Sequence, residues 1–395
     1  MKVKSKPNLD FSNTEIAFKN KSNDALKKAY WLFKMMNKSW FVNIGSKLGT
    51  LAVRLNLPFS KTIVKKTIFE QFCGGTTLLD SQQTIEHLAD FNVVTLLDYG
   101  AEGKSSEEDF NRTMNENIKA LEFAAANKFI PVVTTKITGI ARFELLEKIS
   151  AGDTLSPDEE TEYSNALKRI DAICSAAFKT KTSIFIDAEE SWIQDAIDAI
   201  ANLMMSRYNK EYISVYNTFQ MYRHDRLEFL IKSFEEAKSN GYILGAKLVR
   251  GAYMDKERNR AEEMGYSSPI NKDKAATDDC FNTALRFCID NYEQIALCNA
   301  THNLESSRIL ADLIFERKLP KEHPHLNFCQ LYGMSDNLTF NLAASGYNVG
   351  KYLVYGQVEE VVPYLVRRAQ ENTSVTGDMS RELEFYNIEI KRRGL

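Results

Sequence analysis

Two adjacent arginines and a glutamate interrupt an apolar stretch near the C-terminus. The stretch is YLVRRAQEN, residues 364–372, and it contains Arg367, Arg368 and Glu371. On a helix, residues three and four positions apart lie side by side, so Glu371 would contact both guanidinium groups. One interpretation is a solvated helix face whose ion pair contributes roughly a few tenths of a kcal/mol. The other is an anion clamp, because paired guanidinium groups bind a carboxylate in fork geometry.

Composition excludes several classes of protein. The 395 residues are 44% hydrophobic and carry a net charge of −3, so the chain can bury a large core and nucleic acid is not an expected partner. Residues 1–70 contain 14 Lys+Arg and 4 Asp+Glu, a charge of +10, which leaves −13 for the remainder. The six cysteines include no CxxC or CxxH pair, so neither a zinc site nor a disulfide framework is expected.

Eight apolar runs alternate with helix-patterned segments from residue 92 onward. Such continuous runs are typical of parallel strands covered on both faces. Eight of them predict a (βα)8 barrel of the TIM type, with a doubly wound sheet as the alternative. We expect residues 1–90 to be a basic helical N-terminal extension and residues 91–395 to form the barrel. The runs are residues 92–100, 129–136, 183–190, 212–220, 242–253, 294–303, 325–333 and 347–356.

Polar side chains gather at the ends of these runs, where barrel enzymes place their active sites. Each alone could be a helix cap or a satisfied core group, but a set from nearly every strand favours an active site. No histidine pair has the spacing of metal ligands, so no metal is expected, and neither a GxGxxG nor a P-loop motif occurs. The strand-end residues are Asp98, Glu102, Lys136, Asp187, Gln220, Lys247, Arg250, Thr301, His302, Tyr332 and Tyr352.

Several longer motifs resemble the proline dehydrogenase family, flavin-dependent barrels that oxidise proline. They are IDAEE (186–190), KLVRGAYMDKE (247–257), NATHN (299–303), LYGM (331–334), KYLVYG (351–356) and PYLVRRAQEN (363–372). The motifs occur in the family's order over about residues 92–375, and the combination of KLVRGAY with the last two is highly specific. The first 90 residues show no assigned motif.

The resemblance implies a proline-binding site. Arg367 and Arg368 match the arginine pair that binds the proline carboxylate, and Glu371 matches the glutamate that supports them. Glu102 is similar to an acid after the first strand that helps to hold this clamp. The other residues that match the substrate pocket are Lys136, Asp187, Leu331, Tyr253 and Tyr352.

The same resemblance implies bound FAD. Gln220 would face the polar edge of the isoalloxazine ring, and Thr301 and His302 would lie near the adenine and the pyrophosphate. The residues expected along the ring and the phosphates are Lys247, Val249, Arg250 and Gly251.

The implied reaction is oxidation of L-proline to 1-pyrroline-5-carboxylate, with hydride transfer to the flavin N5 and electrons passing on to a membrane quinone. Hydroxyproline is the alternative substrate, but the hydroxyproline branch tends to have a smaller residue at the position of Tyr352. A third hypothesis is a catalytically silent helical scaffold that binds membranes through its basic N-terminus. For residues 1–90, a solvated cover on the barrel and peripheral contact with an anionic membrane remain alternatives.

The sequence departs from the family pattern at two positions. Val354 stands where the family has proline in YLPYG, and Gln357 stands where a second proline is common, so the loop rigidity could differ. No aldehyde dehydrogenase-like domain follows the clamp helix, and a monofunctional enzyme is therefore expected. The expected location is the cytoplasmic side of a bacterial inner membrane or, in a eukaryote, the mitochondrial inner membrane or matrix.

Overall fold

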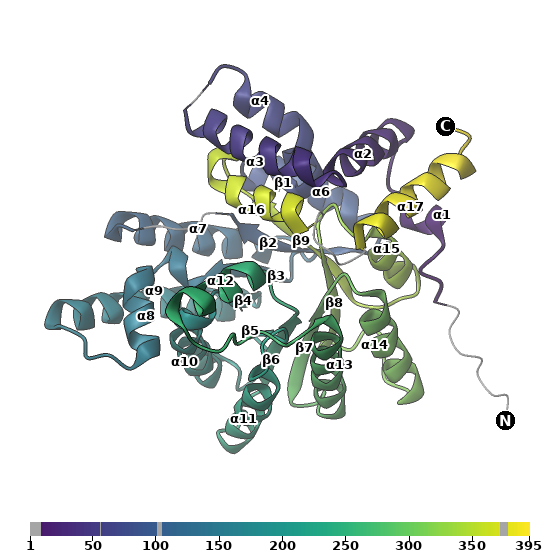
Figure 1. The fold of residues 1–395 in the computed structure, drawn as a ribbon. Helices are drawn as coiled ribbons and strands as arrows, with labels where there is room; N and C mark the ends of the chain where they lie inside the picture. Colours follow the sequence, from purple (N-terminus) through teal and green to yellow (C-terminus); the bar gives the residue numbers. More distant parts are fainter. Residues whose placement is uncertain (1–8, 56, 101–104, 372–377) are drawn as a thin grey trace, which may run out of the picture. The chain divides into compact units, whose positions relative to one another are not determined.

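The central feature of the computed structural model, which describes residues 9–55, 57–100, 105–371 and 378–395, is a closed barrel of eight parallel strands (Figure 1). Its strands follow one another in chain order, and a pairing of β9 with β8 closes the sheet. A doubly wound sheet is open at both edges, so the closure excludes that alternative. The strands are β2 (Val94–Tyr99), β3 (Val132–Lys136), β4 (Ser183–Asp187), β5 (Val215–Gln220), β6 (Leu244–Val249), β7 (Ile295–Ala300), β8 (Leu326–Leu331) and β9 (Val349–Tyr355).

Each of the eight apolar runs contains one of these strands, which confirms the predicted barrel. Every residue of β5 and of β9 is buried. Strands covered on both faces have no polar face to alternate with an apolar one, which explains their continuous apolar sequences.

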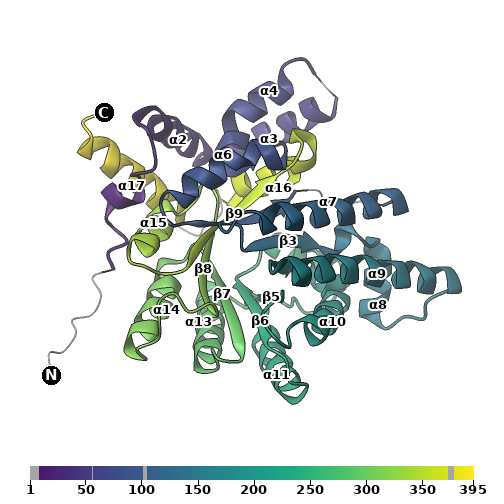
Figure 2. The ribbon, with the colours of Figure 1, turned by 180° about the vertical axis from the view of Figure 1, so that it is seen from behind.

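One compact unit comprises residues 101–301 and 305–328. Its helices begin at recognisable caps: the Ser156 side chain accepts a hydrogen bond from the backbone N–H of Glu159 at 3.3 Å, and the Glu159 carboxylate accepts one from the N–H of Ser156 at 2.9 Å. Helices α7 and α9 pack side by side on this unit (Figure 2). The helices are α7 (Glu107–Ala125), α8 (Phe143–Ala151), α9 (Pro157–Thr180), α10 (Ser191–Tyr208), α11 (Arg226–Ser239), α12 (Met254–Met264), α13 (Lys274–Asp290) and α14 (Leu304–Glu316), with a 3-10 turn at Ile137–Gly139.

The second unit comprises residues 1–100, 302–304 and 329–395. The N-terminal helix α2 packs against the C-terminal helix α17 (Figure 1). The ring of Tyr386 lies 5.2 Å from that of Phe33 at this contact. Arg393 fastens the same end by donating to the carbonyl oxygens of Phe18 and Lys21, both at 2.8 Å. The helices are α1 (Thr14–Ala17), α2 (Asn23–Met36), α3 (Ser39–Arg54), α4 (Ser60–Val64), a π-helical turn (Lys65–Phe69), α5 (Glu70–Phe72), α6 (Leu78–Ala89), α15 (Asp336–Ala344), α16 (Val358–Glu371) and α17 (Asp378–Arg392).

The N-terminal region is helical as expected, but it also contains a strand that the sequence did not predict. Strand β1 (Cys73–Gly75) pairs in parallel with β9. A Cβ atom added at Gly74 would lie 2.7 Å from a side-chain carbon of Leu353, so this close pairing needs glycine. A three-residue strand rich in glycine has no local signal, and only its pairing with β9 defines it. The domain boundary near residue 90 stays a prediction.

Candidate active site

A hydrogen bond and the strand register show which face of β5 and β6 carries the predicted residues. The side-chain amide of Asn217 donates to Asp198 of α10 at 2.9 Å, so Asn217 points toward the surrounding helices. Alternate residues of a strand point to opposite faces, and Gln220 therefore points into the barrel. Gln220 pairs with Val249 in the register of β5 and β6, so Val249 and Lys247, two residues earlier, share its direction.

The same register extends this inner face to β4 and β3. Ile186 pairs with Asn217, so Ile186 points outward and the next residue, Asp187, points inward. Lys136 pairs with Asp187 and lies on the same face. The structure thus brings five predicted residues of the unit formed by residues 101–301 and 305–328 to the barrel interior. They are Lys136, Asp187, Gln220, Lys247 and Val249.

Asp187 and Lys247 form a buried ion pair on this face. The Lys247 Nζ lies 2.6 Å from Oδ1 of Asp187, and the two residues are only 5% and 9% exposed, respectively. The ring of Phe185 lies 5.4 Å from the same ammonium group. Because little water screens the pair, its two charges interact strongly.

Glu189 lies within the IDAEE motif, but the sequence alone assigned it no role. Its carboxylate accepts hydrogen bonds from the backbone N–H of Thr138, at 3.1 Å, and from the Thr138 hydroxyl. Its carbonyl oxygen accepts a hydrogen bond from the Gln220 amide at 2.9 Å. Glu189 therefore ties the turn after Lys136 to the end of β5. The only sequence signal was a second acid two residues after Asp187.

Stability should depend on pH through Glu189. Burial raises the pKa of this carboxyl to about 7 from an ordinary 4.5, so the folded protein binds the proton more tightly than the unfolded chain does. The free energy of unfolding should then fall as pH rises from about 4.5 to about 7. The loss due to Glu189 should be about 3 kcal/mol in the wild type, and Glu189→Gln should abolish it. Urea unfolding at about pH 5 and about pH 8 measures the difference. The exposed Glu263→Gln is the control, and equal pH dependence in both variants would contradict the assignment.

Arg250 and Thr301 meet in a polar cluster of the same unit. The Arg250 guanidinium donates to Asp278 at 2.8 Å, to the Thr301 hydroxyl at 2.7 Å and to the Ser306 hydroxyl at 3.0 Å. Three partners on separate elements hold its orientation. Asp278 and Ser306 were not predicted, because they lie within helices α13 and α14 and only the fold brings them to the strand ends.

The segment after β6 turns sharply at Gly251 and then enters α12. Gly251 has φ +139°, and an added Cβ would lie 2.5 Å from the ring of Tyr222, so no other residue fits there. Tyr253 is half-buried and is the N-cap residue of α12. The buried Glu257 fixes this helix by accepting hydrogen bonds from the N–H and hydroxyl of Ser191, at 2.7 and 2.5 Å.

The predicted clamp arginines lie on α16, in the other unit. Arg368 is 6% exposed and its guanidinium lies 5.2 Å from the ring centre of Tyr364, whereas Arg367 is half-buried. A solvated helix face is therefore wrong for Arg368. Glu371 is the last residue of α16, but its side chain lies outside the described residues, as does the whole of Glu102.

Tyr352 lies in β9, the strand that precedes this helix. The neighbouring Lys351 points toward the start of α15, where its Nζ lies 2.9 Å from Asp336. Alternation places Tyr352 on the opposite face of β9, where it is 6% exposed. Leu331, the last residue of β8, is half-buried.

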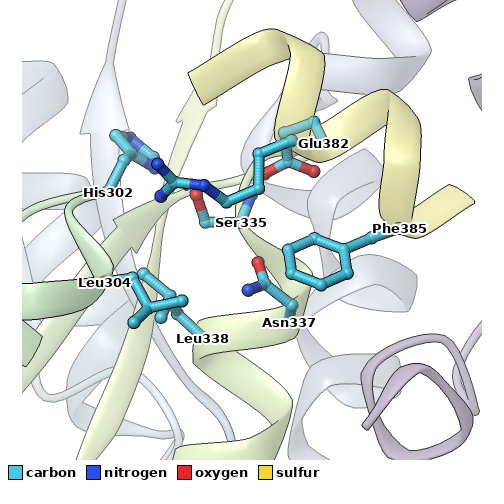
Figure 3. A pocket seen from close by; sticks show the side chains of 8 residues that line it. His302, Leu304, Ser335, Asn337, Leu338, Glu382 and Phe385 are labelled. Carbon is cyan, nitrogen blue, oxygen red and sulfur yellow. Dashed lines mark hydrogen bonds between the residues drawn. The ribbon is translucent and has the colours of Figure 1, made fainter. Parts of the chain in front are cut away.

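His302 lies beside a small pocket of this unit (Figure 3). Its Nδ1 lies 2.9 Å from the Ser335 hydroxyl, and the Ser335 backbone N–H donates to the Glu382 carboxylate. Burial and the nearby Asp336 raise the pKa of Glu382 to about 7. The cavity is about 10 Å³, which is space for about one water molecule. The neighbours Thr301 and His302 therefore have different partners: Thr301 accepts a hydrogen bond from Arg250, whereas His302 pairs with Ser335.

Comparison with known families shows which family the chain belongs to. Residues 81–381 match the family model described as proline dehydrogenase, which is most of the chain. The chain belongs to the proline dehydrogenase family. Membership confirms the expected family and the expectation of an oxidoreductase, because the family and its named relatives are dehydrogenases.

The relatives include enzymes named for two substrates. A mitochondrial proline dehydrogenase 2 of Arabidopsis thaliana is 32% identical over 90% of this chain and 83% of its own length. A hydroxyproline dehydrogenase of Xenopus laevis is 29% identical over 98% of this chain and 90% of its own. A Drosophila melanogaster mitochondrial proline dehydrogenase 1 is 38% identical over 60% of this chain, which spans only 37% of that protein.

Solved structures show the same fold. The crystal structure of proline utilization A from Bdellovibrio bacteriovorus, inactivated by N-propargylglycine, matches with a TM-score of 0.78. It is 18% identical, and the match covers 93% of this chain and 41% of that chain. At this identity the match supports the barrel fold alone.

Proposed function

We propose that this protein oxidises L-proline to 1-pyrroline-5-carboxylate with FAD and passes the electrons to a membrane quinone. The observation that carries the proposal is the arginine pair of α16, in which Arg368 is buried beside the half-buried Arg367. Adjacent guanidinium groups offer the parallel N–H donors that hold a carboxylate in one orientation. Family membership adds proline as the carboxylate-bearing substrate.

The residues around β5 and β6 fit a flavin. Among the described residues, Oε1 of Gln220 is buried and has no hydrogen-bond partner, so it can accept from a ring N–H. The fixed guanidinium of Arg250 suits a phosphate. When bound, FAD would supply the hydride acceptor at N5.

The chain's own residues would position proline and adjust its charge. Arg367 and Arg368 bind the carboxylate, and a fixed carboxylate orients the ring carbon that loses hydride, which makes the reaction effectively unimolecular. The amine must be uncharged when the hydride leaves. The Lys247–Asp187 pair would adjust the charge around this amine: together with the two arginines it makes the pocket positive, and a positive pocket favours the uncharged amine.

The direct test is an absorbance spectrum of the purified protein before and after anaerobic addition of proline. We expect a flavin band that proline bleaches. A colourless protein, or a flavin band that proline leaves unchanged, would contradict the cofactor or the substrate, respectively.

The flavin assignment predicts the behaviour of two variants. Arg250→Ala and Thr301→Val should lower flavin occupancy more than they change proline affinity in the remaining holoenzyme, because the hydrogen bond between these residues orients the cationic group. Flavin content per protein measures the effect. The control is Arg286→Ala, an exposed arginine of α13. If both site variants retain as much flavin as this control, the assignment is wrong.

Hydroxyproline is the second candidate substrate, and a similar enzyme carries that name. Tyr352→Ser should reduce proline turnover and raise relative activity on trans-4-hydroxyproline, because a ring against the substrate's C4 edge leaves no space for a hydroxyl. We expect a selectivity change of about tenfold or more in the ratio of the two kcat/KM values. Tyr352→Phe retains the ring and should keep the wild-type ratio. An unchanged ratio in Tyr352→Ser would remove the basis for preferring proline.

The names of several relatives support the mitochondrial location among the two considered. No helix within the described ranges is long and apolar enough to cross a bilayer. We also propose peripheral contact with a membrane, because the quinone acceptor would lie there.

A further inference from the structure

Helix α3 carries apolar side chains on its outer face. At 100° per residue, Trp40, Leu48, Leu51 and Leu55 fall within an arc of about 80°. Each of them is 53–64% exposed. The opposite side of the helix is also apolar, where Val53 is 3% exposed and faces the groove beside α16. Burial of one face therefore leaves a second apolar face on the surface.

The turn from α3 to α4 extends this face. Leu57 is 49% exposed and Phe59 is 78% exposed. Phe59 also has φ +65°, a left-handed conformation that is rare for a bulky residue. Neither burial nor backbone preference favours phenylalanine here, and Asn would suit the conformation better. We call Trp40, Leu48, Leu51, Leu55, Leu57 and Phe59 the α3–α4 surface.

The charge of the same segment is positive throughout. Between Asp24 and Glu70 the sequence contains nine Lys or Arg residues and no Asp or Glu. The exposed lysines of this segment include Lys27, Lys34, Lys38, Lys65 and Lys66.

We propose that the α3–α4 surface inserts into the headgroup region of an anionic lipid bilayer. Exposed Trp, Leu and Phe side chains among lysines are typical of segments that lie in the plane of a membrane interface. At 16 residues, α3 is too short to span a bilayer. A symmetric dimer through this surface would instead bring two cationic segments together, which charge repulsion opposes.

The position of this surface connects lipid contact with the clamp. Helices α3 and α4 both pack against α16, the helix of Arg367 and Arg368 (Figure 1). Lys61 of α4 forms an ion pair with Glu359 at the start of α16. A groove of about 580 Å³ lies among the three helices, lined by this ion pair and by apolar side chains such as Val53 and Val362. The inference rests on the proposed function only in giving lipid contact a purpose, the delivery of electrons to a membrane quinone.

The test is co-sedimentation of the full-length holoprotein with vesicles of phosphatidylcholine alone or of phosphatidylcholine with phosphatidylglycerol. We expect the protein to bind the anionic vesicles at least tenfold more tightly than the neutral ones. The double variant Leu51→Asn/Phe59→Asn should weaken binding tenfold or more. Lys65→Gln/Lys66→Gln should weaken binding and reduce its salt dependence. The control is Leu79→Asn, which removes a leucine of α6 that is 79% exposed, as much as Phe59, and should bind like wild type.

Light scattering and a dye-linked assay on the same samples separate the outcomes. No binding to anionic vesicles overturns the proposal, as does an unchanged affinity in the Leu51/Phe59 variant. A dimer that this variant dissociates, without vesicle binding, assigns the surface to a second copy instead. Activity with a soluble dye should be the same in all variants. If the protein binds vesicles but proline bleaches no flavin, the proposed function fails while this inference stands.

Discussion

Replacement of Arg368 by Met should raise the KM for proline about 30- to 1,000-fold, equivalent to about 2–4 kcal/mol of binding free energy. The guanidinium is buried, so water does not replace its contact with the carboxylate. Methionine is similar in length and apolar, and it should pack beside Tyr364 without unfolding α16. Flavin content should remain that of wild type, because the clamp binds the substrate rather than the cofactor.

Two further variants show whether geometry or charge is responsible. Arg368→Lys keeps the charge and loses the fork, so its KM should fall between those of wild type and Arg368→Met. Arg317→Met breaks a surface ion pair with Asp290 and should leave the KM unchanged. Steady-state kinetics with proline measure all three. A wild-type KM in Arg368→Met and Arg367→Met would sink the carboxylate clamp.

Replacement of Asp187 by Ala should destabilise the protein by about 3–5 kcal/mol, because it leaves the buried ammonium of Lys247 without its carboxylate. Urea unfolding measures the loss. Glu116→Ala is the matched control: its ion pair with Lys119 has the same 2.6 Å separation, but the Lys119 side chain is 61% exposed, so the loss should be below about 1 kcal/mol.

The double variant Asp187→Ala/Lys247→Met separates stability from catalysis. Removing both charges should restore most of the stability, since no buried charge is left uncompensated. Proline turnover should stay low, because the pair is proposed to act on the bound substrate. Recovery of both stability and turnover would show that the pair is structural only.

The sequence determined the parts of the molecule that depend on local pattern. Continuous apolar runs predicted all eight barrel strands, because a strand buried on both faces needs no distant contact to be recognised. The RRxxE motif after YLVYG predicted a helix with two adjacent arginines. The short strand β1 escaped prediction, since CGG has little strand preference and exists as a strand only through β9.

Tertiary structure alone decided burial, register and partnership. RRxxE fits a solvated face as well as a clamp, and only the packing of α16 buries Arg368. Pairing across strands, which no local pattern encodes, gives Lys247 its partner Asp187 sixty residues away. Likewise, the sequence predicted a basic helical N-terminal extension, but only the fold shows that α3 buries Val53 on one side and leaves Leu51 on the other exposed. A sequence specifies which side chains avoid water, but the number of neighbours that can cover them depends on the whole fold.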